Sequence, residues 1–230
     1  MKARTAFLAC AFVYASAHAQ TEVETHPDFN GVWLAAPGSI VGTEPGEMGS
    51  TGPPPQLTPE AARIRDTYDL LTDDPAYECS PASINRVWSN PVPIEIEQLS
   101  DRVILRYEYM DAVRTVYLDQ QSAPPNVTPE VLGHSIGRYE RSTLIIETAG
   151  FSKSYVGAVT GTPQTETLRT IELLTMAEDG QRFLLEIRHE DPATFTEPWT
   201  SSREFVLSDL ERLEWDCVLE DAGYEDISDP

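Results

Sequence analysis

The residue types best suited to acid–base chemistry gather in one stretch, 133–151, which reads GHSIGRYERSTLIIETAGF. Its polar members include His134, Arg138, Glu140 and Glu147. A histidine or a buried glutamate can act as a general base when its pKa lies near neutrality. An arginine or a tyrosine can stabilise an oxyanion. We therefore take His134 and Glu147 as candidate catalytic bases and Arg138 as their electrostatic partner, in a proton transfer, elimination or cyclisation.

The same residues also allow two interpretations that require no catalysis. Arg138, Glu140 and Glu147 could pair with one another in a purely structural role, with His134 capping a loop. They could also contribute to a ligand site, in which arginines fix a polar head and aromatic side chains line an apolar body. The candidate ligand-binding residues are Tyr107, Tyr109, Tyr117, Arg138, Phe183, His189 and Arg203.

A β-hairpin is the element that would position the central groups. The runs 135–140 and 143–151 flank the two-residue break Arg141-Ser142, and the second run alternates and ends at Gly150-Phe151. Similar alternation predicts nine strands in all, nearly all joined by short turns: 29–34, 93–99, 102–110, 113–119, 135–140, 143–151, 167–177, 182–191 and 200–207. We expect this antiparallel, up-and-down meander to close into an all-β barrel, because closure removes exposed strand edges.

One helix is predicted in the long excursion that follows the first strand. The excursion begins with a segment rich in Gly, Pro and Ser, 36–55. Thr58 then suits a helix N-cap, Pro59 suits the first helical position, and apolar residues recur at helical spacing as far as Leu71. We expect a helix over about 58–71, placed as a lid over a ligand or as a cap on the core.

A barrel of about eight strands encloses room for side chains or for one small ligand. We assign the inward side of each strand by following its aromatic and branched residues: 103, 105, 107 and 109; 113, 115 and 117; 183, 185, 187 and 189; 201, 203 and 205. Polar residues that share parity with apolar ones matter most, because a buried polar group costs free energy unless it is satisfied. By this rule His134, Arg138, Glu140 and Glu147 point into the barrel.

The first 19 residues have the form of a cleaved secretory signal. Lys2 and Arg4 precede an apolar run, and Ala17-His18-Ala19 suits signal peptidase. The run is too short for a membrane span, which needs about 20 apolar residues, and Cys10 leaves a lipoprotein as an alternative. We expect a periplasmic or secreted protein with a polar lead-in (20–28), one domain (29–218) and an acidic tail (219–230).

Net charge limits the partners that the protein can bind, and the cysteines suggest a disulfide. The formal net charge is −22, so nucleic acids and anionic membranes would be repelled. Cleavage of the signal would leave Cys79 and Cys217, and in an oxidising compartment we expect them to form a disulfide; two buried free thiols are the alternative. We expect no membrane span and a monomer or a weak oligomer.

The sequence lacks the motifs of several common enzyme classes. The chain has no Gly-x-Ser-x-Gly elbow, no P-loop and no Rossmann fingerprint. The three histidines that follow the signal, His26, His134 and His189, have no short metal-ligand spacing. We therefore predict no cofactor and no metal.

The central stretch resembles a motif of a family of exported bacterial proteins of unassigned function. In that family it reads Gly-His-Ser-Ile-Gly-Arg-Trp-Glu-Gly-Asp-Thr-Leu-Val-Val-Asp-Thr, with Gly-Phe shortly after. Here Tyr139 replaces the Trp, Arg141-Ser142 the Gly-Asp turn, and Glu147 the Asp. The resemblance implies export and a β-rich single domain, and no particular activity. The first strand, FNGVWL, also resembles the Gly-x-Trp signature of lipocalin-like barrels.

The sequence thus favours an exported, lipocalin-like barrel that binds a small, largely apolar molecule carrying a polar group. An isomerase, cyclase or lyase that uses the same cavity is the first alternative. An envelope protein with a filled barrel is the second.

Overall fold

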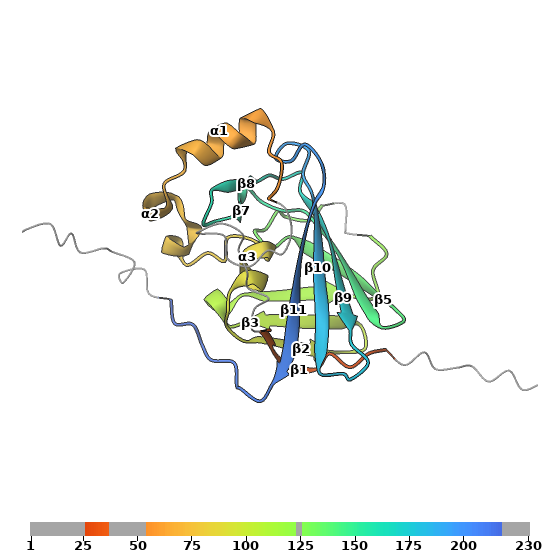
Figure 1. Cartoon of the computed structure of the whole chain (residues 1–230). Coiled ribbons are helices and arrows are strands. Elements are labelled where there is room, and N and C mark those ends of the chain that lie inside the picture. Colours follow the sequence, from red (N-terminus) through yellow and green to blue (C-terminus); the bar gives the residue numbers. More distant parts are fainter. Residues whose placement is uncertain (1–25, 37–53, 123–125, 218–230) are drawn as a thin grey trace, which may run out of the picture.

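The computed structural model describes residues 26–36, 54–122 and 126–217, and the predicted signal peptide and acidic tail lie outside them. Nine strands close into a barrel in the order β1-β11-β10-β9-β6-β5-β4-β3-β2 (Figure 1). Their bounds are β1 Gly31–Ala35, β2 Ile94–Gln98, β3 Arg102–Tyr107, β4 Val113–Tyr117, β5 His134–Glu140, β6 Thr143–Ala149, β9 Arg169–Met176, β10 Arg182–Glu190 and β11 Trp199–Ser208. The predicted all-β barrel with a helical excursion after the first strand is confirmed.

Two connections differ from a simple meander. Strands β4 and β5 pair in parallel, with Val116 beside Ser135 and Tyr117 beside Ile136. A small two-stranded sheet, β7 (Ser154–Gly157) and β8 (Thr162–Gln164), interrupts the path from β6 to β9. The long 118–133 connection makes the parallel pairing possible, because it returns the chain to the barrel end where β4 began.

The predicted helix is two helices. Thr58 caps α1 (Pro59–Thr67) as expected, since its side chain accepts a hydrogen bond from the Ala61 amide. Tyr68 then takes an extended conformation, and Asp69 caps a second helix, α2 (Leu70–Asp73). Further short helices lie at η1 (Pro75–Glu78), α3 (Ile84–Ser89) and η2 (Tyr109–Asp111). In the part of the chain that is described, no helix is long and apolar enough to cross a membrane.

Helix α3 contributes the central side chain of the core. Trp88 is 1% exposed, and its ring meets Tyr107 and Phe205 at centroid distances of 5.3 Å each. Phe183 stacks on Phe205 at 4.9 Å and meets Trp33 edge-on at 4.8 Å. The middle of the barrel is therefore filled by aromatic rings, which pack favourably in these offset and edge-to-face arrangements.

The C-terminal residues 209–217 form an extended strap along the outside of the barrel. The Leu213 and Trp215 amides donate to Glu108 and Asp111, and the Trp215 ring packs on Tyr109 at 5.0 Å. The strap ends in the predicted disulfide, Cys79–Cys217, which joins residues 138 positions apart. The bond thereby ties the strap to the helical excursion that carries α3.

Candidate functional site

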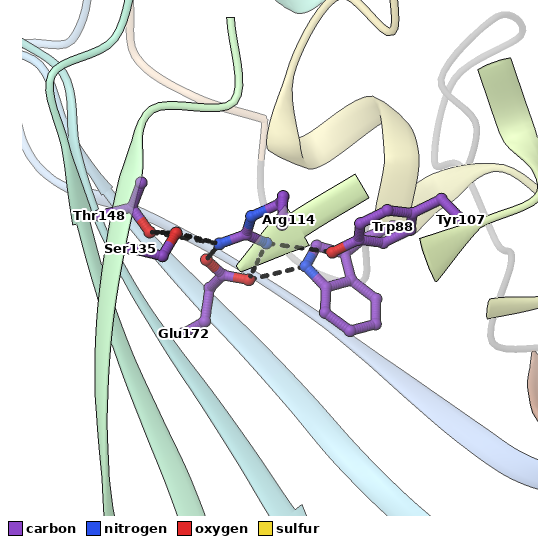
Figure 2. Close-up of polar contacts among 6 residues, drawn as sticks. All are labelled: Trp88, Tyr107, Arg114, Ser135, Thr148 and Glu172. Carbon is purple, nitrogen blue, oxygen red and sulfur yellow. Dashed lines mark hydrogen bonds and ion pairs between the residues drawn. The ribbon is translucent and has the colours of Figure 1, made fainter. Parts of the chain in front are cut away.

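A polar layer lies inside the barrel beside Trp88. It consists of six buried residues, here called the Arg114 cluster, which Figure 2 shows: Trp88, Tyr107, Arg114, Ser135, Thr148 and Glu172. Arg114 donates from Nη2 to Glu172 Oε1 at 2.7 Å and from Nη1 to Glu172 Oε2 at 3.0 Å. The Trp88 indole donates to the same Oε2 at 2.7 Å.

The remaining donors of Arg114 reach three hydroxyl groups. Nη1 donates to the Tyr107 hydroxyl at 3.1 Å, and Nη2 donates to Ser135 at 3.0 Å and Thr148 at 3.2 Å. Ser135 and Thr148 are also hydrogen-bonded to each other at 2.9 Å. Because Ser135 and Thr148 are cross-strand partners on β5 and β6, the sheet itself holds the two hydroxyls side by side.

The inward positions of β5 carry small residues where they face β4. A Cβ on Gly137 would lie 2.6 Å from the Val116 side chain, which projects into the barrel from β4. Ser135, two residues earlier on the same side, is the other small inward residue of β5. The strand therefore accommodates the bulk of Arg114 and Val116 from its parallel neighbour.

The Arg114–Glu172 pair is a fully buried ion pair. The two side chains are 2% and 0% exposed. Burial by itself acts to lower the pKa of Arg114, but the Glu172 carboxylate and the Tyr107 hydroxyl together raise it above its ordinary value. Burial also raises the pKa of Tyr107 above its ordinary value. The cluster consequently holds one positive and one negative charge and is neutral as a whole.

Two hydrogen-bond donors of the cluster have no acceptor among the described residues. Ser135 and Thr148 have two hydroxyl hydrogens between them, and their mutual bond uses one of them. The other has no acceptor among the bonds that these residues make. The Nε of Arg114 is likewise buried without a partner. Such open donors inside a protein call for a water molecule or a ligand group.

A surface pocket of about 380 Å³ reaches this cluster between β4 and the 127–135 segment. Its lining residues are Val113, Arg114, Thr115, Tyr117, Val127, Glu130, Val131, Leu132, Gly133, His134 and Ser135. Arg114 and Ser135, which are 3% and 2% exposed, line its buried end. Val113, which is 57% exposed, and the valines and leucine of the loop give it an apolar part, and Thr115, Tyr117, Glu130 and His134 add polar groups. The volume is within the range of small-molecule sites, about 300–1,000 Å³.

The prediction that the central hairpin turns its charges inward is wrong. The buried residues of β5 and β6 are Ser135, Gly137, Leu144, Ile146 and Thr148, so the opposite faces carry the charges. Arg138 is exposed and pairs with Glu140 at 2.8 Å and with Glu147 at 2.5 Å. Both faces of this hairpin are rich in branched residues, so following branched side chains selected the wrong face.

His134 is half-buried at the barrel rim. Its ring stacks on Tyr117 at 5.0 Å, and its Nε2 lies 2.9 Å from Gln120 Oε1. The predicted inward parity of β4 is wrong, because Arg114 and Val116 are the buried residues and Tyr117 is on the outer side. His134 and Tyr117 therefore line the pocket with side chains on the outer side of the barrel. Arg138 and Glu147 instead form an ion pair on the surface.

The other predicted ligand residues lie in the core. Tyr107 and Phe183 are inside the barrel as expected, but at 0% and 1% exposure they pack against Trp88. Tyr109 is buried under the strap beside Trp215. His189 and Arg203 are also buried; Arg203 donates to the Trp88 carbonyl at 2.8 Å, and burial lowers the pKa of Arg203 to about 10. The structure therefore does not bring these residues together around one cavity.

Arg114 and Glu172 are the charged residues that sequence reasoning missed. Both share parity with apolar residues, Arg114 with Val116 and Glu172 with Leu174. The parity rule was applied to β4, where Val113 and Tyr117 led it to the opposite face, and it was not applied to β9. Trp88 gave no comparable signal, because its helix is short and no strand pattern surrounds it.

Among the residues that the structure describes, no group of three or more His, Cys, Asp or Glu side chains is placed to hold a metal ion. The donor set of the Arg114 cluster is also unsuited to a metal. Its one carboxylate is already shared between a guanidinium and an indole.

The sequence matches no protein-family model and no curated protein. Among solved structures, it is similar to a crystal structure of a mutant of the fluorescent protein UnaG. The two are 10% identical, the TM-score is 0.34, and the match covers 79% of this chain and 97% of that chain. The barrel described above rests on the hydrogen-bonded strand pairs of this chain itself.

Proposed function

We propose that the protein binds a small, neutral, largely apolar molecule through one hydrogen-bonding group in the pocket between β4 and the 127–135 segment. The observation that carries this proposal is that the pocket combines the apolar side chains of Val113, Val131 and Leu132 with the buried polar residues Arg114 and Ser135. Thr115, Glu130 and His134 add further polar groups to its lining. This places the ligand at the rim of the barrel, not in its aromatic-filled middle.

The polar group of the ligand is an acceptor in this proposal. The Ser135–Thr148 pair has a spare hydroxyl hydrogen, and the Arg114 Nε has an unused N–H. A ketone, an ester or an alcohol oxygen would satisfy a buried donor of this kind. A negatively charged group gains less, because Glu172 already neutralises Arg114 and the chain carries a formal charge of −22.

An enzymatic role has weaker support. Of the three proposed catalytic residues, only His134 lines the pocket between β4 and the 127–135 segment. Glu147 and Arg138 form an exposed ion pair. Glu147 is therefore not positioned to act as a base in the pocket, and Arg138 is not positioned to stabilise an oxyanion there. A filled-barrel scaffold would account for the aromatic core, but it gives no role to the open donors beneath the pocket.

We also propose that the protein works outside the cytoplasm after removal of residues 1–19. The disulfide supports this location, because such bonds persist in oxidising compartments. Cell fractionation and N-terminal sequencing test it. A mature chain that begins near Gln20 in the periplasm or the medium is expected, and an intact Met1 in the cytoplasm would contradict it.

Mass spectrometry of the purified protein under native conditions tests the ligand proposal. A retained neutral organic molecule is expected, or, in its absence, a rise in melting temperature with 2-heptanone. The hydrocarbon 1-heptene is the matched control, because it has a similar chain and lacks the acceptor oxygen. No retained ligand and equal responses to the two compounds would contradict the proposal.

A further inference from the structure

The pairing between β4 and β5 is the shortest in the barrel. It joins Val116 to Ser135 and Tyr117 to Ile136, two residue pairs in all, whereas the next shortest pairing, β1 with β2, has three. The first residues of β4, 113–115, extend beyond this pairing and are here called the β4 edge. In the part of the chain that is described, the β4 edge therefore has no strand beside it on its β5 side.

The hydrogen bonds between β3 and β4 show which way the backbone of the β4 edge points. At the start of β4, the Tyr107 amide donates to the Ala112 carbonyl, and the bond made by the Leu118 amide at the other end follows the same alternation. Because alternate residues of an antiparallel pair carry the bonds, the even-numbered residues of this stretch bond to β3. The N–H and C=O groups of Val113 and Thr115 therefore point away from β3, across the seam and toward the neutral-ligand pocket that these residues line.

The segment that precedes β5 does not satisfy these groups. If β5 continued backward in register, Gly133 would lie beside Arg114. It would then donate to the Val113 carbonyl and accept from the Thr115 amide. Gly133 instead has a left-handed φ of +65°, and its amide donates to the Glu130 carbonyl at 3.1 Å. Among the described residues, no backbone bond joins the β4 edge to this segment, so the ladder position beside Arg114 is open to another molecule.

We infer that the β4 edge binds one amino-acid unit of a short, uncharged, extended peptide or acylated amino acid. This inference rests on the proposed neutral-ligand pocket, names its ligand class and adds two backbone contacts to those proposed above. A peptide unit presents an N–H and a C=O, separated by a single carbon, to a neighbouring parallel strand. The N–H would donate to the Val113 carbonyl, and the C=O would accept from the Thr115 amide. Both protein groups point sideways in the plane of the sheet, so one ligand in the seam reaches them together.

The surroundings of the open ladder position select the side chain of that unit. Directly paired residues of adjacent strands project to the same face, and Arg114, at 3% exposure, projects into the barrel. A large side chain beside it would have to enter the packed interior, so glycine fits best. The groups on either side of the glycine face outward with Val113 and Thr115, where the exposed Val113 side chain favours apolar ones. A free carboxylate is disfavoured, because the chain carries a formal charge of −22.

Amide hydrogen exchange of the full mature chain tests the open edge without any ligand. The amides of Arg114 and Val116 bond to β3 and should exchange slowly. The Thr115 amide between them should exchange at least about tenfold faster, because it has no strand partner. Slow exchange at all three positions would show that the β4 edge is already paired, and the inference would fail.

Hexanoylglycine methyl ester is the probe for the ligand class. Hexanoylsarcosine methyl ester is the matched control, because a methyl group replaces the hydrogen of its amide nitrogen. We expect the glycine ester to raise the melting temperature and to slow exchange of the Thr115 amide, and the sarcosine ester to do neither at equal concentration. Equal effects of the two esters would overturn the inference and leave the neutral-ligand pocket standing. If the glycine ester has no effect, the inference fails, and the response to 2-heptanone decides whether the neutral-ligand pocket fails with it.

The corresponding valine ester tests the position of the unit. Its side chain would enter the interior beside Arg114, so its effect on the melting temperature should be much smaller than that of the glycine ester. Equal shifts with the two esters would contradict the ladder position beside Arg114.

Thr115→Pro removes the protein amide from the proposed contact. Proline is tolerated where a strand N–H faces away from its neighbour, so the bonds to β3 are spared. Thr115→Val is the matched control, because it changes the same side chain and keeps the amide. The shift with the glycine ester should be lost in Thr115→Pro and kept in Thr115→Val, and equal shifts in the two variants would contradict the hydrogen bond to Thr115. Should Thr115→Pro fail to fold, the comparison of the glycine and sarcosine esters on the wild type still decides.

Discussion

The guanidinium of Arg114 and the carboxylate of Glu172 meet inside the barrel at 2.7 Å between Nη2 and Oε1. They come from β4 and β9, and no direct pairing joins these two strands. Each charge would be costly in the interior alone, and together they are compensated. The indole of Trp88 completes the pair, so the same contact also fixes helix α3 in the barrel.

The first prediction concerns this ion pair. Glu172→Gln leaves Arg114 charged and buried without a counterion, so unfolding free energy should fall by about 3–5 kcal/mol. The double variant Arg114→Met, Glu172→Leu should lose less than either single variant, because it leaves no unpaired charge. Urea unfolding of wild type, Arg114→Met, Glu172→Leu and the double variant gives the coupling between the two residues, and Glu172→Gln is measured beside these four proteins. Additive losses would show that the two groups are not coupled in the folded protein.

The second prediction concerns pH. Burial lowers the pKa of His189 from 6.5 to about 4. Between pH 6.5 and pH 4 the unfolded chain therefore binds a proton that the folded chain does not, and stability falls as pH falls. Above pH 6.5 this contribution is complete and constant. The loss across the window should be about 3 kcal/mol.

The matched variant for this test is His189→Phe, which keeps a ring against Trp199, where the histidine stacks at 4.6 Å. Carboxylates titrate in both proteins, so the informative quantity is the difference between their stability–pH curves. The variant should lack the histidine contribution to the slope between pH 6.5 and pH 4. Parallel curves would mean that His189 protonates equally well in the folded protein.

The third prediction concerns the disulfide. Replacing Cys79 and Cys217 by serine removes a cross-link between residues 138 positions apart. Chain entropy gives an expected loss of about 4–5 kcal/mol, reduced by any structure that the reduced denatured chain retains. The urea midpoint of the double variant should fall clearly below that of the oxidised protein. Equal midpoints would show that the strap contacts alone hold residues 209–217 in place.

The barrel could be predicted from sequence because strand alternation is a local signal. Each of the nine predicted strands overlaps a barrel strand, and the boundaries differ by a few residues at most. The parallel β4–β5 pair could not be predicted, since nothing in 118–133 specifies which end of the barrel the chain rejoins. The small strands β7 and β8 lie in a Gly- and Thr-rich link that has too little alternation to mark them.

The site was harder to predict because it depends on which face of each strand turns inward. On β10 and β11 one face is clearly more apolar, and the inward residues Phe183 and Phe205 were assigned correctly. On β4 and β5 the inward face carries Arg114 and Ser135, which a hydrophobicity rule assigns to solvent. Their burial is favourable only because Glu172 arrives from β9, and that is a tertiary contact.

The most direct test of the neutral-ligand pocket is a titration with prodan, a neutral fluorescent ketone whose emission shifts to the blue in apolar surroundings. Val113→Asp places a charge at the exposed apolar mouth, and Leu184→Asp is the matched control, because it changes an exposed apolar strand residue outside the pocket. Wild type and Leu184→Asp should show the same saturable blue shift, and Val113→Asp should bind at least tenfold more weakly. Equal binding by all three proteins, or no saturable binding to wild type, would contradict the assignment of this pocket.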